Sequence, residues 1–268
     1  SSIKELLDAV DAVNIATPTT THYDIALQAI EAGKHILIEK PITNKIDEAN
    51  EILKRAKDQK LIVQVGHIER FNPAIKALPE MLKEEKIVAI DVQRMGPYDP
   101  RIDDTDVIQD LMIHDIDVIL SVVNSPVKHI SASGVSVVSE TPDIANARIE
   151  FKNGCVANLT ASRISLKNMR KTPFFQKDAY ISVDFLEKKC EVVKMKDAPE
   201  HPGDFDMILQ NAEGVKKQIY FDNPEVEGNN AILDELETFA EAINNDSKPI
   251  VTLHDGTEAL RVATMIIN

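Results

Sequence analysis

Apolar positions in the first quarter of the chain follow two alternating periods. Short β-branched runs predict buried strands at residues 12–17, 35–39 and 61–65, and apolar residues at helical spacing predict helices at 19–31 and 46–58. The strands are apolar along nearly their whole length, as in a parallel sheet that helices cover on both faces. This order therefore predicts an α/β unit with right-handed crossovers.

The pattern changes after Arg70, so we expect a domain boundary near residues 66–70. Beyond it we expect a helix at residues 72–83, a strand at 87–94, a loop at 96–104 and a second helix at 106–123. A strand-rich stretch is expected at 127–221, and two helices, at 230–244 and 254–267, close the chain. Lys152-Asn153-Gly154 is typical of a hairpin turn. Short strands at this spacing predict a large open, mostly antiparallel sheet with one packed face. We expect its other face to be apolar and to bind further copies of the chain.

Composition narrows the classes of protein. The chain is 43% hydrophobic and carries 44 acidic against 30 basic residues, so its net charge of −14 excludes binding nucleic acid through a broadly basic surface. Cys155 and Cys190 are too few for a disulfide scaffold or a metal cluster. No apolar run approaches the ~20 residues that span a bilayer, and the first residues lack the cationic start of a signal peptide. We expect a cytoplasmic protein with no membrane partner, and the missing initiator Met indicates a processed or incomplete chain.

Two predicted strand ends carry candidate chemistry, because ligands of parallel sheets bind beyond the carboxyl ends of the strands. Thr17 and Thr19 follow the first strand and could offer hydroxyl and backbone N–H groups to a cofactor. Alternatively, a threonine there simply caps the next helix. Lys40, between Glu39 and Pro41, follows the second strand and could hold a substrate oxygen or transfer a proton. The alternative is a surface lysine beside a turn proline.

The predicted helix at 106–123 carries a polar cluster on an apolar background. Asp110 and His114 are four residues apart and share one helix face, and Asp117 follows three residues later. A neighbouring carboxylate can fix the imidazole tautomer for acid–base catalysis. A structural histidine explains the pattern equally well. One histidine with two aspartates is a poor zinc site, so we expect no metal.

Residues 163–171 hold four basic side chains and no acidic one. Such a segment could receive a diphosphate that the overall charge disfavours. The alternative is a solvated loop or strand face.

Together these motifs resemble the glucose–fructose oxidoreductase / inositol dehydrogenase / MocA family. The resemblance rests on Ala16-Thr17-Pro18 with His22, on residues 32–41 ending in Glu39-Lys40-Pro41, and on the Asp110, His114 and Asp117 helix, in that order. It implies a Rossmann domain, partial here, at residues 1–69 and a substrate-binding and oligomerisation domain at 70–268. The last helices are expected to pack back on the first domain.

The resemblance also implies the function and the site. It implies an NAD-dependent sugar dehydrogenase, with NADP not excluded, that forms a dimer or tetramer through the open sheet. The catalytic residues would be Lys40, Asp110 and His114, and the cofactor would be bound by Thr17, Pro18, Thr19, His22, Glu39, Lys40 and Pro41. Substrate contacts would come from Arg70, Asn72, Arg163, Lys167 and Arg170.

A finer resemblance concerns the substrate. Residues 66–73 and 162–171 look like those of the family's UDP-N-acetylglucosamine 3-dehydrogenases, which implies oxidation at C3 of this nucleotide sugar. An inositol or simple-sugar dehydrogenase of the same family is the alternative. A sensor or assembly module that has lost the cofactor is a third reading.

One departure from the family pattern concerns the cofactor. The G-x-G-x-x-G turn that receives the pyrophosphate is absent, and so is the acidic residue that would follow it. We therefore expect that roughly 60 residues of the parent, its first strands and helices, are lacking and that this chain holds the cofactor poorly.

Overall fold

A small parallel sheet forms the first part of the molecule. The computed structural model describes the chain except for residues 1, 83–85, 101–104, 202, 204–205, 223, 225 and 227. Its three strands lie in the order β1 (Ala12–Ile15), β2 (His35–Glu39) and β3 (Val63–Gly66), all parallel. This confirms the predicted parallel arrangement, which also has helices on both of its faces.

The helices around this sheet are placed by their apolar residues. One hydrophobic cluster joins the sheet to α2 (Thr19–Glu31), α3 (Ile46–Asp58) and α7 (Leu253–Ile267), and another joins Leu37 and Ile62 to α6 (Ala231–Asn244) on the other face. A short helix that the periodicity did not predict, α1 (Ile3–Ala9), precedes β1. Ser2 and Glu5 form a capping box at its start, a signal that the sequence does contain.

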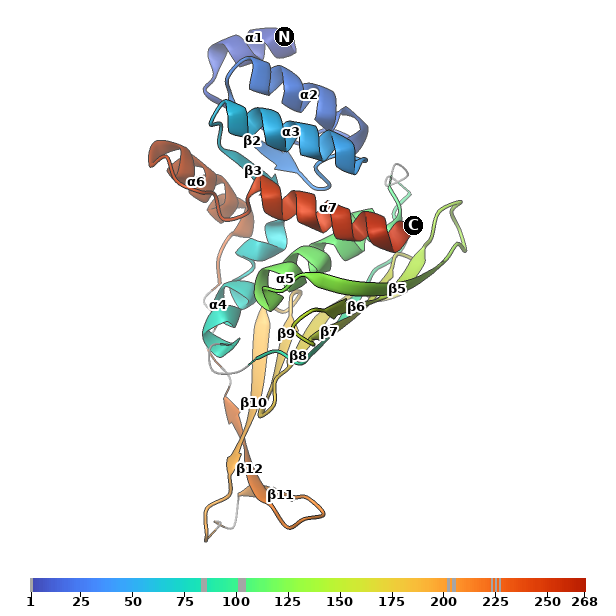
Figure 1. The fold of residues 1–268 in the computed structure, drawn as a ribbon, viewed down its shortest axis with the longest axis vertical. Coiled ribbons are helices and arrows are strands. Elements are labelled where there is room, and N and C mark those ends of the chain that lie inside the picture. The colour runs from blue at the N-terminus through green and yellow to red at the C-terminus, as the bar shows by residue number, and fades with distance from the viewer. Residues whose placement is uncertain are drawn as a thin grey trace.

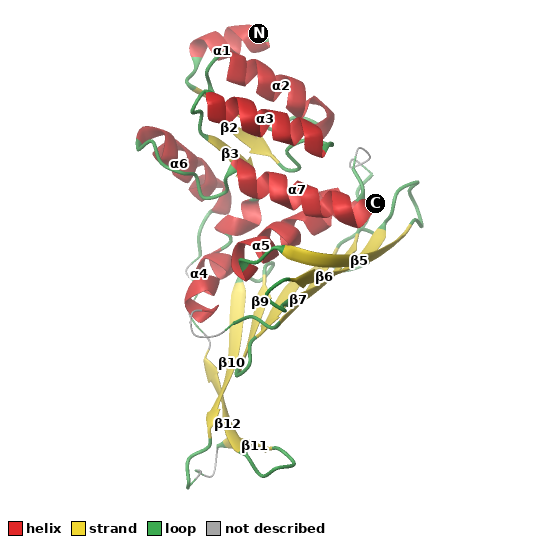
Figure 2. Ribbon diagram, in the orientation of Figure 1, coloured by secondary structure: helices red, strands yellow, loops and turns green. Residues whose placement is uncertain are grey.

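The second part is built on a nine-stranded sheet, drawn in Figures 1 and 2. Its order is β11-β12-β10-β9-β8-β4-β7-β6-β5, and every neighbouring pair is antiparallel except β4 with β7. The bounds are β4 Ala89–Met95, β5 Val127–Val135, β6 Ile144–Phe151, β7 Val156–Ser162, β8 Met169–Phe175, β9 Ala179–Asp184, β10 Lys189–Asp197, β11 Met207–Gln210 and β12 Lys216–Asp222. The predicted mostly antiparallel sheet and the hairpin between β6 and β7 are confirmed.

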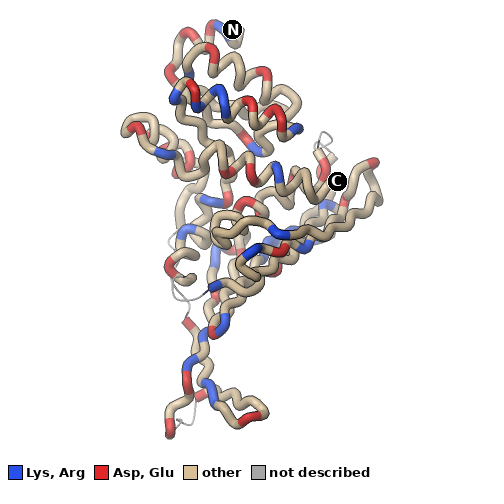
Figure 3. Tube along the Cα trace, in the orientation of Figure 1, with Lys and Arg blue, Asp and Glu red and all other residues tan. Residues whose placement is uncertain are grey.

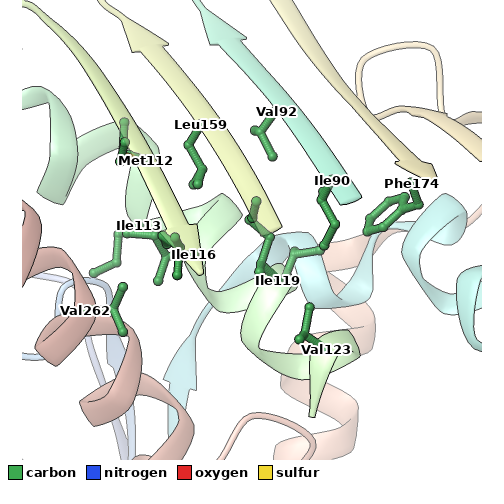
Figure 4. Packing of buried hydrophobic residues seen from close by; sticks show 14 of the residues in the cluster. Ile90, Val92, Met112, Ile113, Ile116, Ile119, Val123, Leu159, Phe174 and Val262 are labelled. Atoms are coloured by element: carbon green, nitrogen blue, oxygen red, sulfur yellow. The ribbon is translucent and has the colours of Figure 1, made fainter. Parts of the chain in front are cut away.

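Helices cover one face of this sheet. Side chains of α4 (Pro73–Leu82), α5 (Ile113–Val123) and α7 pack against the inward residues of the central strands, as Figure 4 shows for Ile116 and Ile119 beside Leu159 and Ile90. Burying one such side chain contributes about 1.5–3 kcal/mol, so this layer fixes where α5 lies. No helix in the described part of the chain is long and apolar enough to cross a membrane.

The other face of the sheet is open, but its centre is polar. Asn158 donates to Asp91 across 2.8 Å and Thr160 donates to Asn146 across 2.9 Å, both between neighbouring strands. The expected apolar character is therefore wrong for the centre of the face. Outward positions there carry polar side chains that pair with each other across neighbouring strands. Figure 3 shows that both acidic and basic residues occur along the strands of this sheet.

Helix α7 belongs to both parts of the molecule. Its Leu253 and Leu260 pack in the cluster of the small sheet, whereas Val262 and Ala263 pack in the cluster of the large sheet. The two sheets are therefore joined by shared apolar packing.

Gly256 lets α7 approach the small sheet. A Cβ atom at this position would lie 2.8 Å from Val65 and 2.9 Å from Ile42. Alanine favours a helix over glycine by up to about 1 kcal/mol, whereas overpacking a core costs about 1–3 kcal/mol. We expect Gly256→Ala to lower the free energy of unfolding by about 1–2 kcal/mol in urea titrations. Gly228→Ala, at a glycine with open space around it, is the control, and equal effects would contradict the packing argument.

Candidate active site

Three strand ends of the small sheet meet at one edge. Residues 16–18 follow β1, Lys40 follows β2 and His67 follows β3. Because the strands are parallel, these segments lie side by side at the carboxyl edge, where open α/β sheets bind ligands. Ala16, Thr17 and Pro18 are exposed there.

His22 holds two of these strand ends together. Its ring is buried, with Nε2 at 2.9 Å from the Thr17 carbonyl and Nδ1 at 3.0 Å from the Pro41 carbonyl. Both ring nitrogens thus face protein backbone, and a ligand has no nitrogen of His22 to contact. The sequence prediction grouped His22 with the cofactor contacts, whereas its bonds make it a clamp between the two loops.

Lys40 reaches from the small sheet to the helical layer of the large one. Its Nζ donates to the Asp110 carbonyl oxygen at 2.7 Å and lies 3.2 Å from Asp110 Oδ1. The two side chains are 17% and 14% exposed, so a small ligand can still reach them. The structure thus brings together two residues that the sequence placed in one site.

The helix that carries Asp110 and His114 begins with a π-helical turn, Ile108–Met112, in which Asp110 lies. The sequence predicts one α-helix over 106–123, but regular α-helix begins only at Ile113. Asp106 caps the start by accepting from the backbone of Ile108 and Gln109. Single π turns are frequent at functional sites, and this one widens the helix where Lys40 enters. Of the predicted loop at 96–104, residues 101–104 lie outside the described residues.

His114 is neutral near pH 7. Burial is the main cause that lowers its pKa well below the ordinary value, and the charges of Lys40 and Arg94 add to it. Its Nδ1 is buried without a partner in the described structure, so Nε2 is the nitrogen available to a ligand. A neutral imidazole with one accessible nitrogen can accept a proton there.

Buried ion pairs hold the helix in place. Arg94 of β4 donates to both oxygens of Asp115, at 2.7 and 2.9 Å, and to Glu69 at 3.0 Å. Arg70 donates to Asp117 at 2.7 Å. Glu69 and Arg70 lie in the 3-10 turn Ile68–Phe71 after β3, so both pairs fix α5 relative to the small sheet. This is the role the structure gives to Arg70 and Asp117.

The basic segment at 163–171 does not form one patch. Arg163 is buried and bonded to Asp143, Ser139 and Thr141, while Lys167 is exposed in a loop. Successive side chains of a strand point to opposite faces, so Arg170 pairs with Glu69 whereas Lys171 pairs with Asp184. A single diphosphate cradle made of this whole segment is therefore wrong.

Asn72 is also occupied by internal contacts. Its Oδ1 accepts from the backbone of Ala74, and its Nδ2 donates to the Phe185 carbonyl. It caps the start of α4, although the sequence analysis assigned it to the substrate.

Comparison with known proteins gives the family. The family profile described as "Oxidoreductase family, NAD-binding Rossmann fold" matches residues 1–67, and "GFO/IDH/MocA C-terminal domain" matches residues 88–179. The solved structure of UDP-N-acetylglucosamine 3-dehydrogenase from Acidithiobacillus ferrooxidans is 33% identical, with a TM-score of 0.88, over 99% of this chain and 80% of that one. The chain belongs to the GFO/IDH/MocA oxidoreductase family.

Other members of the GFO/IDH/MocA family match in different degrees. The curated A. ferrooxidans sequence is 40% identical over 194 residues, which are 71% of this chain and 61% of that protein. The scyllo-inositol 2-dehydrogenase (NAD(+)) of Bacillus subtilis is 27% identical over 97% of this chain and 75% of its own length. Levoglucosan dehydrogenase, solved with NADH and L-sorbose, is 19% identical with a TM-score of 0.82, which shows the shared fold. The match to the curated A. ferrooxidans sequence thus spans less than two thirds of that protein's length.

The carboxyl edge of the small sheet is the place where an open α/β sheet of this family would hold its cofactor. The backbone after β1 is exposed at this edge, and a Cβ atom at Gly66 would lie 2.8 Å from Glu39 Oε2 and 3.1 Å from the Glu39 Cα atom, so the ends of β2 and β3 approach closely there. A cleft of about 620 Å³ near Lys57, Lys248 and Leu253 lies at the amino end of β3, on the opposite edge, and does not join this site.

Sequence reasoning missed His67 and the Arg94 network. His67 follows β3 directly, so its place at the shared strand edge was the signal that could have revealed it. Arg94, Asp115 and Glu69 carry no such signal, because their pairing joins residues that only the folded chain brings together.

Proposed function

We propose that the protein is an NAD-dependent dehydrogenase that oxidises the C3 hydroxyl of UDP-N-acetylglucosamine. The observation that carries the proposal is the contact of Lys40 with Asp110 beside a neutral His114, in a member of this oxidoreductase family. The choice of substrate is supported by the 40% identity to the A. ferrooxidans enzyme of that name.

The residues of the chain suit removal of a proton from a hydroxyl. Nε2 of His114 accepts the hydroxyl proton, and the electron pair of the broken O–H bond stays on oxygen. The Lys40 ammonium group donates a hydrogen bond to that oxygen and stabilises its developing negative charge. Asp110 holds Nζ of Lys40 in place. Bound NAD would supply the acceptor for the hydride that leaves the carbon.

We propose a reduced set of ligand contacts. The cofactor contacts that we propose at the strand edge are Thr17, Pro18, Glu39, Lys40 and Pro41. Thr19 and His22 are left out because both are buried. Arg170, whose side chain is 42% exposed, and Lys167 remain as candidates for the substrate phosphates.

Substitution at the two central residues tests the mechanism. We expect Lys40→Ala and His114→Ala to lower kcat of the full-length protein by about 10²–10⁴-fold, because each removes a group that acts on the reacting hydroxyl. The control variants are Lys45→Ala and His129→Ala, at exposed positions, and circular dichroism checks that every variant is folded. Wild-type rates in the first two variants would remove these residues from the mechanism.

The substrate is tested by NADH formation with a panel of UDP-sugars, inositols and free sugars. We expect the highest kcat/KM with UDP-N-acetylglucosamine. Turnover of an inositol instead would favour the activity named for the B. subtilis relative, and no turnover with NAD or NADP would favour a binding module.

We further propose that copies of the protein associate through the open face of the large sheet, as a dimer or tetramer. Figure 2 shows every helix near this sheet on its other face, so nothing in the described chain covers the open one. Because the centre of this face is polar and hydrogen-bonded, such an interface would be polar rather than apolar like a protein core. Light scattering that finds a monomer would refute this association.

A further inference from the structure

Two histidines at the candidate active site share an unusual feature. His67, which is 1% exposed, and His114 each have a buried Nδ1 atom with no partner in the described structure. Their ring centroids lie 6.4 Å apart and the rings stand edge to face at 86°. These two atoms are therefore unpaired in the same small region.

An unpaired buried nitrogen is costly. Leaving one such group without a hydrogen bond costs about 1–3 kcal/mol, and folded proteins seldom leave two together. The ring separation is too long for a direct hydrogen bond between the imidazoles and suits one bridging water. One water that contacts both Nδ1 atoms would satisfy both groups.

Burial, together with nearby charges, keeps both rings neutral before the reaction. Burial lowers the pKa of His67, and Arg70 and Lys40 lower it further against the opposing effect of Asp117 and Asp255. His114 is lowered by burial, then by Lys40, Arg94, His67 and Arg170. Each neutral ring has one N–H donor and one accepting nitrogen.

The proposed reaction requires one particular tautomer of each histidine ring. For Nε2 of His114 to accept a proton, the hydrogen of that ring must be on Nδ1. The Nδ1–H group then donates to the water, and the water donates to Nδ1 of His67, whose own hydrogen is on Nε2.

We propose that His67 is a positioning residue which fixes the tautomer of His114 through one bridging water and receives a proton from it during the reaction. When the substrate proton reaches Nε2 of His114, the Nδ1 proton of that ring passes to the water, and a water proton passes to Nδ1 of His67. No other bond changes, and the positive charge moves to His67. This role rests on the proposed function of His114, whereas the tautomer does not depend on activity.

The tautomer can be measured in the protein without ligands by long-range ¹H–¹⁵N correlation spectra of the histidine rings. The chain has seven histidines, so single substitutions assign the signals. We expect the Nδ1–H form for His114 and the Nε2–H form for His67 in the wild type.

Two substitutions of His67, by residues of similar size, distinguish the effect of a hydrogen-bond acceptor at this position from the effect of packing. Asn places an oxygen near the position of Nδ1, whereas Leu fills the space without an acceptor. We expect His67→Asn to keep His114 in the Nδ1–H form, and His67→Leu to convert it to a mixture or to the Nε2–H form. His129→Leu, at an exposed histidine, is the control and leaves the His114 signals unchanged.

Kinetics of the full-length protein add a second readout. We expect His67→Leu to lower kcat about 10–100-fold and to shift its pH profile, and His67→Asn to restore most of both. An Nε2–H form of His114 in the wild type, or the same His114 tautomer in His67→Leu and wild type, would overturn the proposal. If His67→Leu does not fold, the wild-type and His67→Asn spectra still decide it. A protein that proves inactive on every substrate would refute the proposed function and leave the spectroscopic result valid.

Discussion

Replacing Arg94 by methionine is expected to lower the free energy of unfolding by about 3–5 kcal/mol. Arg94 is 2% exposed and lies between the carboxylates of Asp115 and Glu69. Burial opposes its charge, but these two carboxylates outweigh burial and raise its pKa above the ordinary value. Without Arg94, Asp115 is left buried and unpaired. A loss of this size is a large part of the 5–15 kcal/mol that typically stabilises a domain.

Urea unfolding of matched variants measures this effect. Arg261→Met is the control, because Arg261 and Glu258 form a half-exposed pair within α7 that contributes no more than about 1 kcal/mol. We expect Arg94→Met combined with Asp115→Leu to be more stable than Arg94→Met alone, since the second change removes a buried charge. Equal losses in Arg94→Met and Arg261→Met would show that the buried pair contributes little.

Replacing Glu235 by glutamine is expected to stabilise the protein increasingly as pH rises. Glu235 lies on α6 and is 4% exposed, and its Oε1 has no partner in the described structure. Gln64, which donates to the Glu235 carbonyl at 2.9 Å, also has an unpartnered side-chain oxygen. A protonated Glu235 could donate to that oxygen, which the ionised form cannot.

The sign of the effect follows from the pKa. Burial, with a smaller contribution from the charge of Glu39, raises the pKa of Glu235 from 4.5 to about 7. Between these values the unfolded chain releases the proton and the folded chain keeps it, so stability falls as pH rises. Above about pH 7 the cost reaches its full size, about 3 kcal/mol at ~1.4 kcal/mol per pKa unit.

Denaturation of wild type and Glu235→Gln across this range tests it. We expect the two to differ least near pH 4 and the variant to gain up to about 3 kcal/mol by pH 8. Glu237→Gln, at an exposed position of the same helix, controls for the change in charge. A difference that does not change with pH would contradict a raised pKa at Glu235.

Local sequence determined much of this fold. The apolar runs at β2 and β3 and the helical periodicity of α2 and α3 are local patterns, and the parallel sheet follows from their order. The place of Lys40 followed from the same reasoning, because it comes directly after a strand.

The features that could not be predicted from the sequence depend on contacts between residues that are distant along the chain or on details of backbone hydrogen bonding. Arg163 belongs to a basic segment in sequence but pairs with Asp143 in the fold. The π turn around Asp110 differs from a regular helix in its hydrogen bonding, which apolar periodicity does not reveal. The functions of Asn72 and His22 depend on which backbone groups reach them, and folding alone determines that.

The packing of α7 has a consequence for synthesis. The largest hydrophobic cluster of each sheet includes residues of this helix, which spans Leu253–Ile267. During translation the strands of the small sheet are made before this helix, so part of their apolar surface stays uncovered until α7 is made, roughly two hundred residues later. Until α7 has been made, this apolar surface is exposed to solvent and is a site where the unfinished chain can aggregate.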